Sequence, residues 1–203
     1  MGALLVLASC TGGDSLEKGG CLMLDSGWTL SSEGVQGRFD ASVPSTVAGV
    51  LNEGGYFGER VLDGKNYASV DKSIFDGEWT YSKTFRFSPA SAQKYEMVFD
   101  GLDYYADIIL NGKKLASSDT TSGVFIRRAF DVTSLLGKKN TLEVTLKRAQ
   151  PGDLNIGFVD WNPRPLDESM GIVRPVYIHS TGNVSLEDVF VIPDLDPENL
   201  SEA

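Results

Sequence analysis

The chain has 203 residues, with 28 acidic against 18 basic side chains and a formal net charge of −10. The length suits one domain with a substantial core, or one domain and a tail. The excess of acidic residues disfavours nucleic acid as a partner, because phosphate binding needs Lys and Arg. A single histidine, His179, and two cysteines, Cys10 and Cys21, are too few for a Cys/His zinc site. His179 lies in an alternating apolar run that predicts a strand, so we expect neither a metal site nor a Ser-His-Asp triad.

The first ten residues, MGALLVLASC, are apolar and end in small residues before Cys10. This segment resembles a bacterial lipoprotein signal, in which the cysteine becomes the lipidated first residue of the mature chain. We therefore expect residues 1–21 to be a signal and linker, Cys10 to carry lipid, and the protein to be exported to the periplasm or the outer-membrane surface. The alternative is a disulfide between Cys10 and Cys21 in an exported protein. No stretch reaches the roughly 18 apolar residues of a membrane span, so we expect membrane contact only through the lipid anchor.

From about Leu22 the apolar residues recur mostly at every second position, which is typical of strands half buried in a sheet. The exception is Val47–Glu53, which predicts a short helix with Thr46 as its N-cap and Gly54 as its stop. The strand faces are clearest in three runs, whose apolar members are Trp79, Tyr81, Phe85 and Phe87; Tyr95, Met97 and Phe99; and Leu142, Val144 and Leu146.

Asn111-Gly112 predicts a tight hairpin turn, and the runs VRPVYIHS and VSLEDVFVI predict further strands. Many short strands at regular spacing indicate an all-β fold, which we expect to be an antiparallel β-sandwich. The last stretch, DLDPENLSEA, is acidic and polar, as a linker would be.

Six blocks of sequence carry a resemblance to a known family. In chain order they are VPSTVAGVLNEGGYFGERVLDGKNY, WTYSKTF, GLDYYADIILNGKKL, GVFIRRAFDVTSLL, NTLEVTL and MGIVRPVYI. Any one block would be weak, but the six in this order resemble the N-terminal domain of glycoside hydrolase family 2. The stretch DWNPRPLDESMGI is more similar to the exo-β-glucosaminidase and β-mannosidase branch than to the β-galactosidase branch.

The resemblance implies a jelly-roll, galactose-binding-like β-sandwich, usually called the sugar-binding domain, over residues 22–192, with residues 193–203 as the start of a linker. In that family an immunoglobulin-like domain and a (β/α)₈ barrel follow, and the barrel carries the two catalytic glutamates. We therefore expect this chain to hold no catalytic residue, no cofactor and no metal, and to be inactive alone. The implied parent is an exported retaining β-glycosidase that hydrolyses terminal β-mannosyl or β-glucosaminyl residues of a carbohydrate partner.

A polar loop, Gly157–Gly171, is the most informative segment for sugar binding. A Trp face stacks on the C–H side of a pyranose, and Asp or Asn exchanges hydrogen bonds with its hydroxyls. The matching loop of the family helps to close the sugar pocket, so the resemblance implies that Asp160 and Trp161 contact substrate, with Asn162 and Arg164 as further candidates. The alternative is that Trp161 plugs the end of the sandwich and Asp160 caps a turn.

The remaining carboxylates are scattered and predict no catalytic dyad, so we expect them to cap turns and to keep the surface soluble. Asp103, Tyr104 and Tyr105 begin a predicted strand, and packing explains them better than binding does. Two other functions stay open from the sequence. In the first, the chain is a free-standing surface lipoprotein that binds glycans. In the second, it is a structural domain that only braces its neighbours.

Overall fold

The computed structural model describes the chain over residues 16, 19–58, 60–90, 93–155, 161–182, 184–186 and 189–192. Within these ranges the regular secondary structure is mostly strand, with one α-helix and two short 3-10 helices. Every strand pairing that the structure describes is antiparallel. The predicted all-β sandwich with one short helix is therefore confirmed.

The larger sheet has six strands in the order β3-β2-β5-β11-β8-β9. Their bounds are β2 (Trp28–Ser32), β3 (Val35–Ala41), β5 (Trp79–Arg86), β8 (Tyr105–Leu110), β9 (Lys113–Ala116) and β11 (Lys139–Lys147). The non-sequential neighbours of β5 and β11 mean that the chain crosses repeatedly between layers, as a jelly roll requires.

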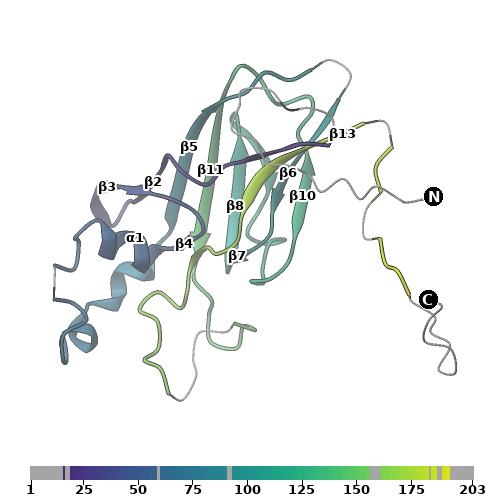
Figure 1. The fold of residues 1–203 in the computed structure, drawn as a ribbon. Coiled ribbons are helices and arrows are strands. Elements are labelled where there is room, and N and C mark those ends of the chain that lie inside the picture. The colour runs from purple at the N-terminus through teal and green to yellow at the C-terminus, as the bar shows by residue number, and fades with distance from the viewer. Residues whose placement is uncertain are drawn as a thin grey trace, which may run out of the picture.

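A four-stranded sheet, in the order β1-β13-β6-β10, forms the second layer of the sandwich (Figure 1). Its strands are β1 (Cys21–Met23), β6 (Lys94–Phe99), β10 (Arg128–Asp131) and β13 (Val176–Thr181). A third sheet of three short strands, in the order β4-β12-β7, consists of β4 (Ser45–Thr46), β7 (Leu102–Asp103) and β12 (Gly171–Ile172).

One hydrophobic core lies between the two large sheets. The apolar faces predicted from the two-residue alternation are all buried in it: Trp79, Tyr81, Phe85 and Phe87; Tyr95, Met97 and Phe99; Leu142, Val144 and Leu146. Burial of large aromatic and aliphatic side chains is the main favourable term in folding, at about 25 cal/mol per Å² of apolar surface. The core therefore fixes the register of each strand, because a slip of one residue would expose its whole apolar face.

The predicted helix and hairpin both form with the local chemistry expected of them. Helix α1 is Val47–Glu53, the Thr46 side chain accepts a hydrogen bond from the Gly49 amide, and Gly54 is its C-cap. Asn111 and Gly112 both have positive φ between β8 and β9, which is the geometry of a tight hairpin turn. The 3-10 helices η1 (Asn66–Ser69) and η2 (Lys72–Phe75) connect α1 to β5.

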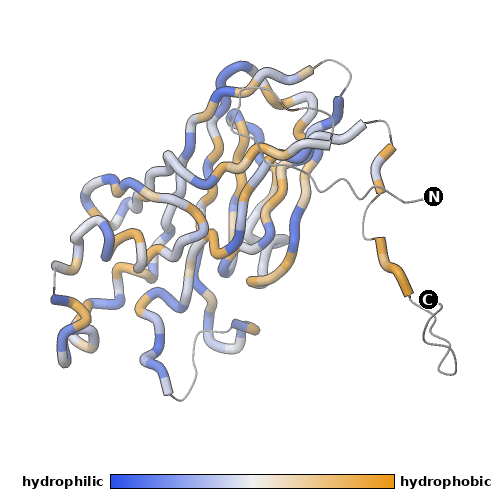
Figure 2. The backbone as a smooth tube through the Cα atoms, viewed as in Figure 1, coloured by the Kyte–Doolittle hydropathy of each residue, from blue (hydrophilic) through white to orange (hydrophobic). Residues whose placement is uncertain are grey.

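The segment after β13 differs from the sequence-based expectation. VSLEDVFVI predicts a strand, yet none of its described residues, 184–186 and 189–192, lies in one. The apolar side chains there are exposed, Phe190 by 83%, and the segment lies apart from the sandwich as an apolar stretch near the C-terminus (Figure 2). Alternation alone does not make a strand, because the backbone also needs a neighbouring strand to pair with.

Candidate functional site

The small β4-β12-β7 sheet brings three distant parts of the chain together at the candidate site. Gly171 on β12 pairs with Thr46 on one side and with Asp103 on the other. A Cβ atom on Gly171 would lie 2.6 Å from the Thr46 Cα and closer still to the Ser45 carbonyl oxygen, so only glycine fits between these backbones. The sheet thereby places the start of α1, the buried Asp103 and the end of the predicted sugar loop side by side.

The buried carboxylate of Asp167 fastens the loop to the first turn of α1. Its Oδ2 accepts a hydrogen bond of 2.7 Å from the Ala48 amide, and its Oδ1 accepts one of 3.0 Å from the Ser169 amide. The Val47 amide donates to the Met170 carbonyl at 2.8 Å. Burial raises the pKa of Asp167, and the amide donors oppose that rise. Helix N-termini leave unpaired amides, so Asp167 caps this helix from a remote part of the sequence.

Three further contacts hold the same loop in place. The Tyr67 hydroxyl, from η1, donates to the Arg164 carbonyl at 2.9 Å. Within the loop, the Arg164 guanidinium pairs with the Glu168 carboxylate at 2.8 Å. The Asn155 amide group donates to the Glu168 carbonyl at 2.8 Å. Together with Asp167, these contacts fix the path of the backbone on the C-terminal side of Trp161.

Asp103 lies beneath this loop as a buried acid with an unpaired oxygen. Its side chain is 1% exposed, and its Oδ1 has no hydrogen-bond partner among the described residues. Burial, reinforced by the negative charges of Asp167 and Glu168, raises the pKa of Asp103 to about 7. A buried carboxyl that stays protonated avoids the cost of an unpaired charge in a low-dielectric interior. The sequence pattern predicts a packing role for Asp103, and nothing local signals its proximity to two other acids.

Three of the four predicted sugar contacts lie on the outer part of the loop. Trp161 is 82% exposed, so its ring does not plug the end of the sandwich, and Asn162 and Arg164 are exposed beside it. Asp160 and Cys10 lie outside the described residues. The structure therefore leaves the Trp161 ring free for a ligand or another domain, and its loop is anchored at the Arg164–Ser169 end.

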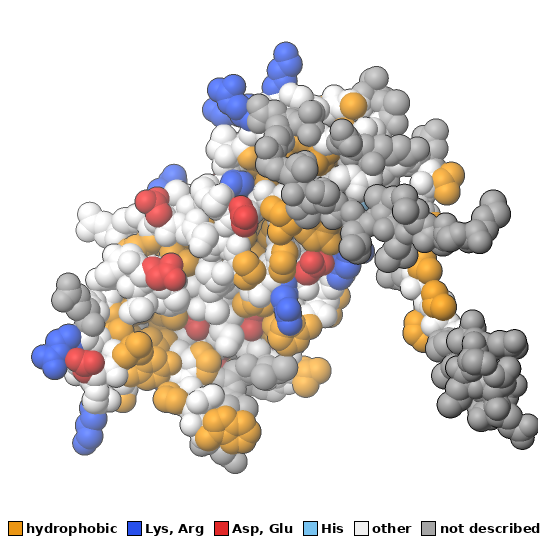
Figure 3. Space-filling view, viewed as in Figure 1, with side chains coloured by type: hydrophobic (Ala, Val, Ile, Leu, Met, Phe, Trp, Pro, Cys, Tyr) orange, Lys and Arg blue, Asp and Glu red, His pale blue; other side chains and the backbone are white. Residues whose placement is uncertain are grey.

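A hollow of about 300 Å³ lies between α1 and the loop. Its lining combines apolar and polar side chains, among them Ala48, Asn52, Phe57, Tyr67, Pro165 and Leu166. Figure 3 shows apolar side chains gathered at this end of the molecule, over the region where Figure 1 places α1 and the segment that follows it. The volume lies at the lower limit of small-molecule sites, and the hollow could receive one side chain or one part of a larger ligand.

Two further features bear on the sequence-based expectations. Cys21, at the start of β1, is disulfide-bonded in the structure. Across the ranges described, no helix is long and apolar enough to cross a membrane, and no group of three or more His, Cys, Asp or Glu side chains could hold a metal ion.

The comparisons with known proteins agree with this architecture. A family model described as "Glycosyl hydrolase 2 galactose-binding domain-like" matches residues 28–155. The chain is 36% identical over 153 residues to an exo-β-D-glucosaminidase of Hypocrea jecorina, an alignment that covers 74% of this chain and 17% of that protein.

Two solved structures share the fold over most of the chain. The exo-chitosanase CsxA of Amycolatopsis orientalis superposes with a TM-score of 0.79 and 25% identity, over 88% of this chain and 22% of that one. A β-D-mannosidase from Dictyoglomus thermophilum superposes with a TM-score of 0.62 and 26% identity, over 78% of this chain and 22% of that one. The chain spans about a fifth of the length of curated relatives that it matches.

Proposed function

The chain belongs to glycoside hydrolase family 2, as the galactose-binding-like N-terminal domain of its exo-β-glucosaminidase and β-mannosidase branch, and we propose that it serves a retaining β-glycosidase of that branch. The proposed substrate is a carbohydrate with a terminal β-glucosaminyl or β-mannosyl residue. The observation that carries the proposal is the match to the family model over residues 28–155, joined to the 36% identity with an exo-β-D-glucosaminidase.

We propose that this domain has a non-catalytic part in the reaction. A retaining glycosidase needs two carboxyl groups about 5–5.5 Å apart that can both reach the sugar. Asp103 and Asp167, two acids that the fold brings close together, are each 1% exposed, so a substrate on the surface would not reach both carboxyl groups. The (β/α)₈ barrel of such an enzyme, which follows an immunoglobulin-like domain, would supply the two catalytic glutamates.

The role proposed for the loop is to close one side of the sugar pocket of the complete enzyme. Asp160, Trp161, Asn162 and Arg164 are the proposed contacts to the substrate. The anchoring of the loop through Asp167 and Tyr67 supports this role, because a site that is ordered before binding loses less conformational entropy when the ligand arrives.

Export as a lipoprotein, with residues 1–21 as signal and linker and lipid on Cys10, is a separate proposal. The apolar segment that ends in small residues before Cys10 supports this proposal. Cys21 is disulfide-bonded in the structure, and the sequence has one other cysteine, Cys10. A disulfide between the two competes with lipidation, because a lipidated thiol cannot also pair. Intact-mass measurement of the membrane fraction separates the two. Lipidation predicts a cleaved chain that begins at Cys10 and carries the added mass of the lipid, whereas a disulfide predicts an unlipidated chain whose mass rises by two hydrogen atoms on reduction.

The enzymatic proposal is tested with 4-nitrophenyl β-D-glucosaminide and 4-nitrophenyl β-D-mannoside. The complete reading frame that contains this chain is expected to hydrolyse one of them, with retention of the anomeric configuration. The 203-residue chain by itself is expected to release no nitrophenol above the buffer rate. Turnover by the isolated chain, or inversion by the complete polypeptide, would contradict the proposal.

A further inference from the structure

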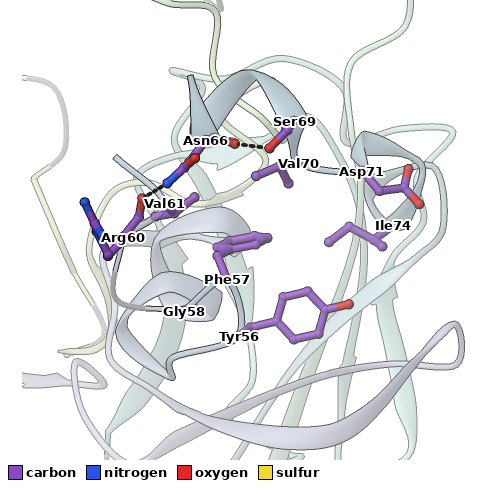
Figure 4. A pocket seen from close by; sticks show the side chains of 10 residues that line it. All are labelled: Tyr56, Phe57, Gly58, Arg60, Val61, Asn66, Ser69, Val70, Asp71 and Ile74. Carbon is purple, nitrogen blue, oxygen red and sulfur yellow. Dashed lines mark hydrogen bonds between the residues drawn. The ribbon is translucent and has the colours of Figure 1, made fainter. Parts of the chain in front are cut away.

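A second hollow, of about 540 Å³, lies in the segment between α1 and β5 and is distinct from the loop that carries Trp161. Figure 4 shows apolar side chains, among them Phe57, Val70 and Ile74, around its interior, with the Tyr56 ring along one wall. Polar groups of Asn66, Ser69 and Asp71 lie around its edge. The volume falls within the range of about 300–1,000 Å³ that is typical of small-molecule sites.

The aromatic wall of this hollow is held rigidly by a row of ring contacts that reaches the core. Tyr56 is 43% exposed, and its ring meets Phe39 at 5.9 Å and Phe57 at 5.2 Å between centroids, both edge to face. Phe57 in turn lies 6.4 Å from Phe75, which lies 6.5 Å from Trp79 on β5. An exposed ring that is already fixed by its neighbours loses little entropy when a ligand stacks on it.

The glycines around Tyr56 make this arrangement feasible. A Cβ atom on Gly54 would lie 2.8 Å from the Phe39 ring, so its absence lets Phe39 reach Tyr56. Gly55 and Gly58, on either side of Tyr56 and Phe57, have φ of +75° and +78°, a conformation that L side chains rarely adopt. The sequence GGYFG thus places two neighbouring aromatic side chains in the lining of the hollow.

Among the described residues that line the hollow, Asp71 carries the negative charge. Its Oδ1 accepts a hydrogen bond of 2.9 Å from the Ser73 amide, which orients the carboxylate at the start of η2. Hydrogen bonds from Ser73 lower the pKa of Asp71, so the group is ionised at neutral pH. Arg60, a cation on the lining, is paired with Asp63 at 2.8 Å. The hollow therefore combines an apolar aromatic wall with an oriented negative group.

We propose that this hollow is a second carbohydrate site, which binds a β-linked glucosamine oligosaccharide with the C–H face of one pyranose against Tyr56 and its ammonium group beside Asp71. The choice of an amino sugar rests on the proposed function, while the site itself rests on the geometry of the hollow. The Asn66 amide group donates to the Arg60 carbonyl at 2.8 Å and the Ser69 hydroxyl to the Asn66 carbonyl at 2.7 Å, so both side chains offer their oxygens as acceptors to sugar hydroxyls. The net charge of −10 attracts a polycationic saccharide from a distance.

The test is a titration of the full 203-residue chain with the β-1,4-linked glucosamine tetramer, followed by amide chemical shifts, with the mannose tetramer as the neutral comparison. Tyr56→Ala is expected to weaken binding of the glucosamine tetramer by about tenfold or more. Tyr56→Phe keeps the ring and is expected to bind within about twofold of the native chain. Asp71→Asn preserves the acceptor to Ser73 and is expected to weaken binding of the glucosamine tetramer by about threefold to tenfold while leaving the mannose tetramer unaffected.

Phe125→Ala is the matched control, because Phe125 is another aromatic side chain, 57% exposed, outside the hollow. It is expected to change nothing, and unchanged shifts in the core of each variant verify its fold. The proposal is overturned if no binding is seen up to about 10 mM saccharide, or if Tyr56→Ala binds as the native chain does. Either result removes this site and leaves the proposed function standing, since that function depends on hydrolysis by the complete polypeptide.

Discussion

Replacing the buried Asp103 by asparagine tests the electrostatic account of the site. The pKa of Asp103 rises from 3.8 to about 7 on folding, so the folded chain binds this proton more tightly than the unfolded chain does. The free energy of unfolding that Asp103 contributes is therefore fully present below pH 4, falls as the pH rises from about 4 to 7, and is lost above about pH 7. An asparagine side chain does not titrate in this range, so the Asp103→Asn variant should lack this decline.

The size of the effect follows from the pKa change. One pKa unit corresponds to about 1.4 kcal/mol, so a rise of about three units sets an upper bound near 4 kcal/mol. Partial screening in the protein interior reduces this bound, so the free energy of unfolding of the native chain is expected to fall by about 2 kcal/mol between pH 4.5 and pH 8.5 because of Asp103. Relative to the native chain, Asp103→Asn should gain about that much stability at the higher pH.

Urea unfolding followed by tryptophan fluorescence measures this directly, at pH steps from 4.5 to 8.5. Asp119→Asn is the control, because Asp119 is exposed and its replacement removes the same negative charge from an acidic chain. The reasoning is refuted if the stability difference between Asp103→Asn and the native chain does not change with pH. It is also refuted if Asp119→Asn reproduces the change, since general charge repulsion would then explain it.

Three further substitutions test the packing of the site by the same urea assay. Gly171→Ala should destabilise the chain by about 3 kcal/mol or more, because its Cβ would overlap the backbone of Ser45 and Thr46; a loss below about 1 kcal/mol would contradict the close approach. Asp167→Ala should lower the free energy of unfolding by about 2–4 kcal/mol, because the Ala48 and Ser169 amides lose their acceptor. An unchanged urea midpoint would show that Asp167 does not fasten the loop. Trp161→Ala should change stability by no more than about 0.5 kcal/mol, because its ring is exposed, and a loss above about 2 kcal/mol would place that ring in the core.

The sequence predicted the elements whose causes are local. Helix α1 begins after Thr46, whose side chain accepts from the Gly49 amide, and ends at Gly54, whose amide donates to the Val50 carbonyl. Asn111-Gly112 forms a turn because these two adjacent residues adopt positive φ. The buried faces of β5, β6 and β11 followed from the two-residue period of a strand. The regular spacing of many short strands indicated an antiparallel β-sandwich, and the family resemblance added its jelly-roll topology.

The parts of the site that were missed depend on contacts between distant residues. Asp167 caps α1 through the amide of Ala48, which lies 119 positions before it, and no local pattern connects a loop acid to that helix. Asp103 looked like a strand residue, and its unusual pKa arises only because β7 and β12 bring it near Asp167 and Glu168. The strand predicted after β13 was wrong for a different reason. Its local alternation is clear, but the described residues there form no strand.

The most direct test of the central claim compares two polypeptides in one assay. The 203-residue chain and the complete reading frame that contains it are each incubated with 4-nitrophenyl β-D-glucosaminide and 4-nitrophenyl β-D-mannoside. A non-catalytic domain of a family 2 β-glycosidase predicts hydrolysis of one substrate by the complete polypeptide and none by the chain alone. Hydrolysis by the isolated chain, or failure of the complete polypeptide with both substrates, would contradict the account.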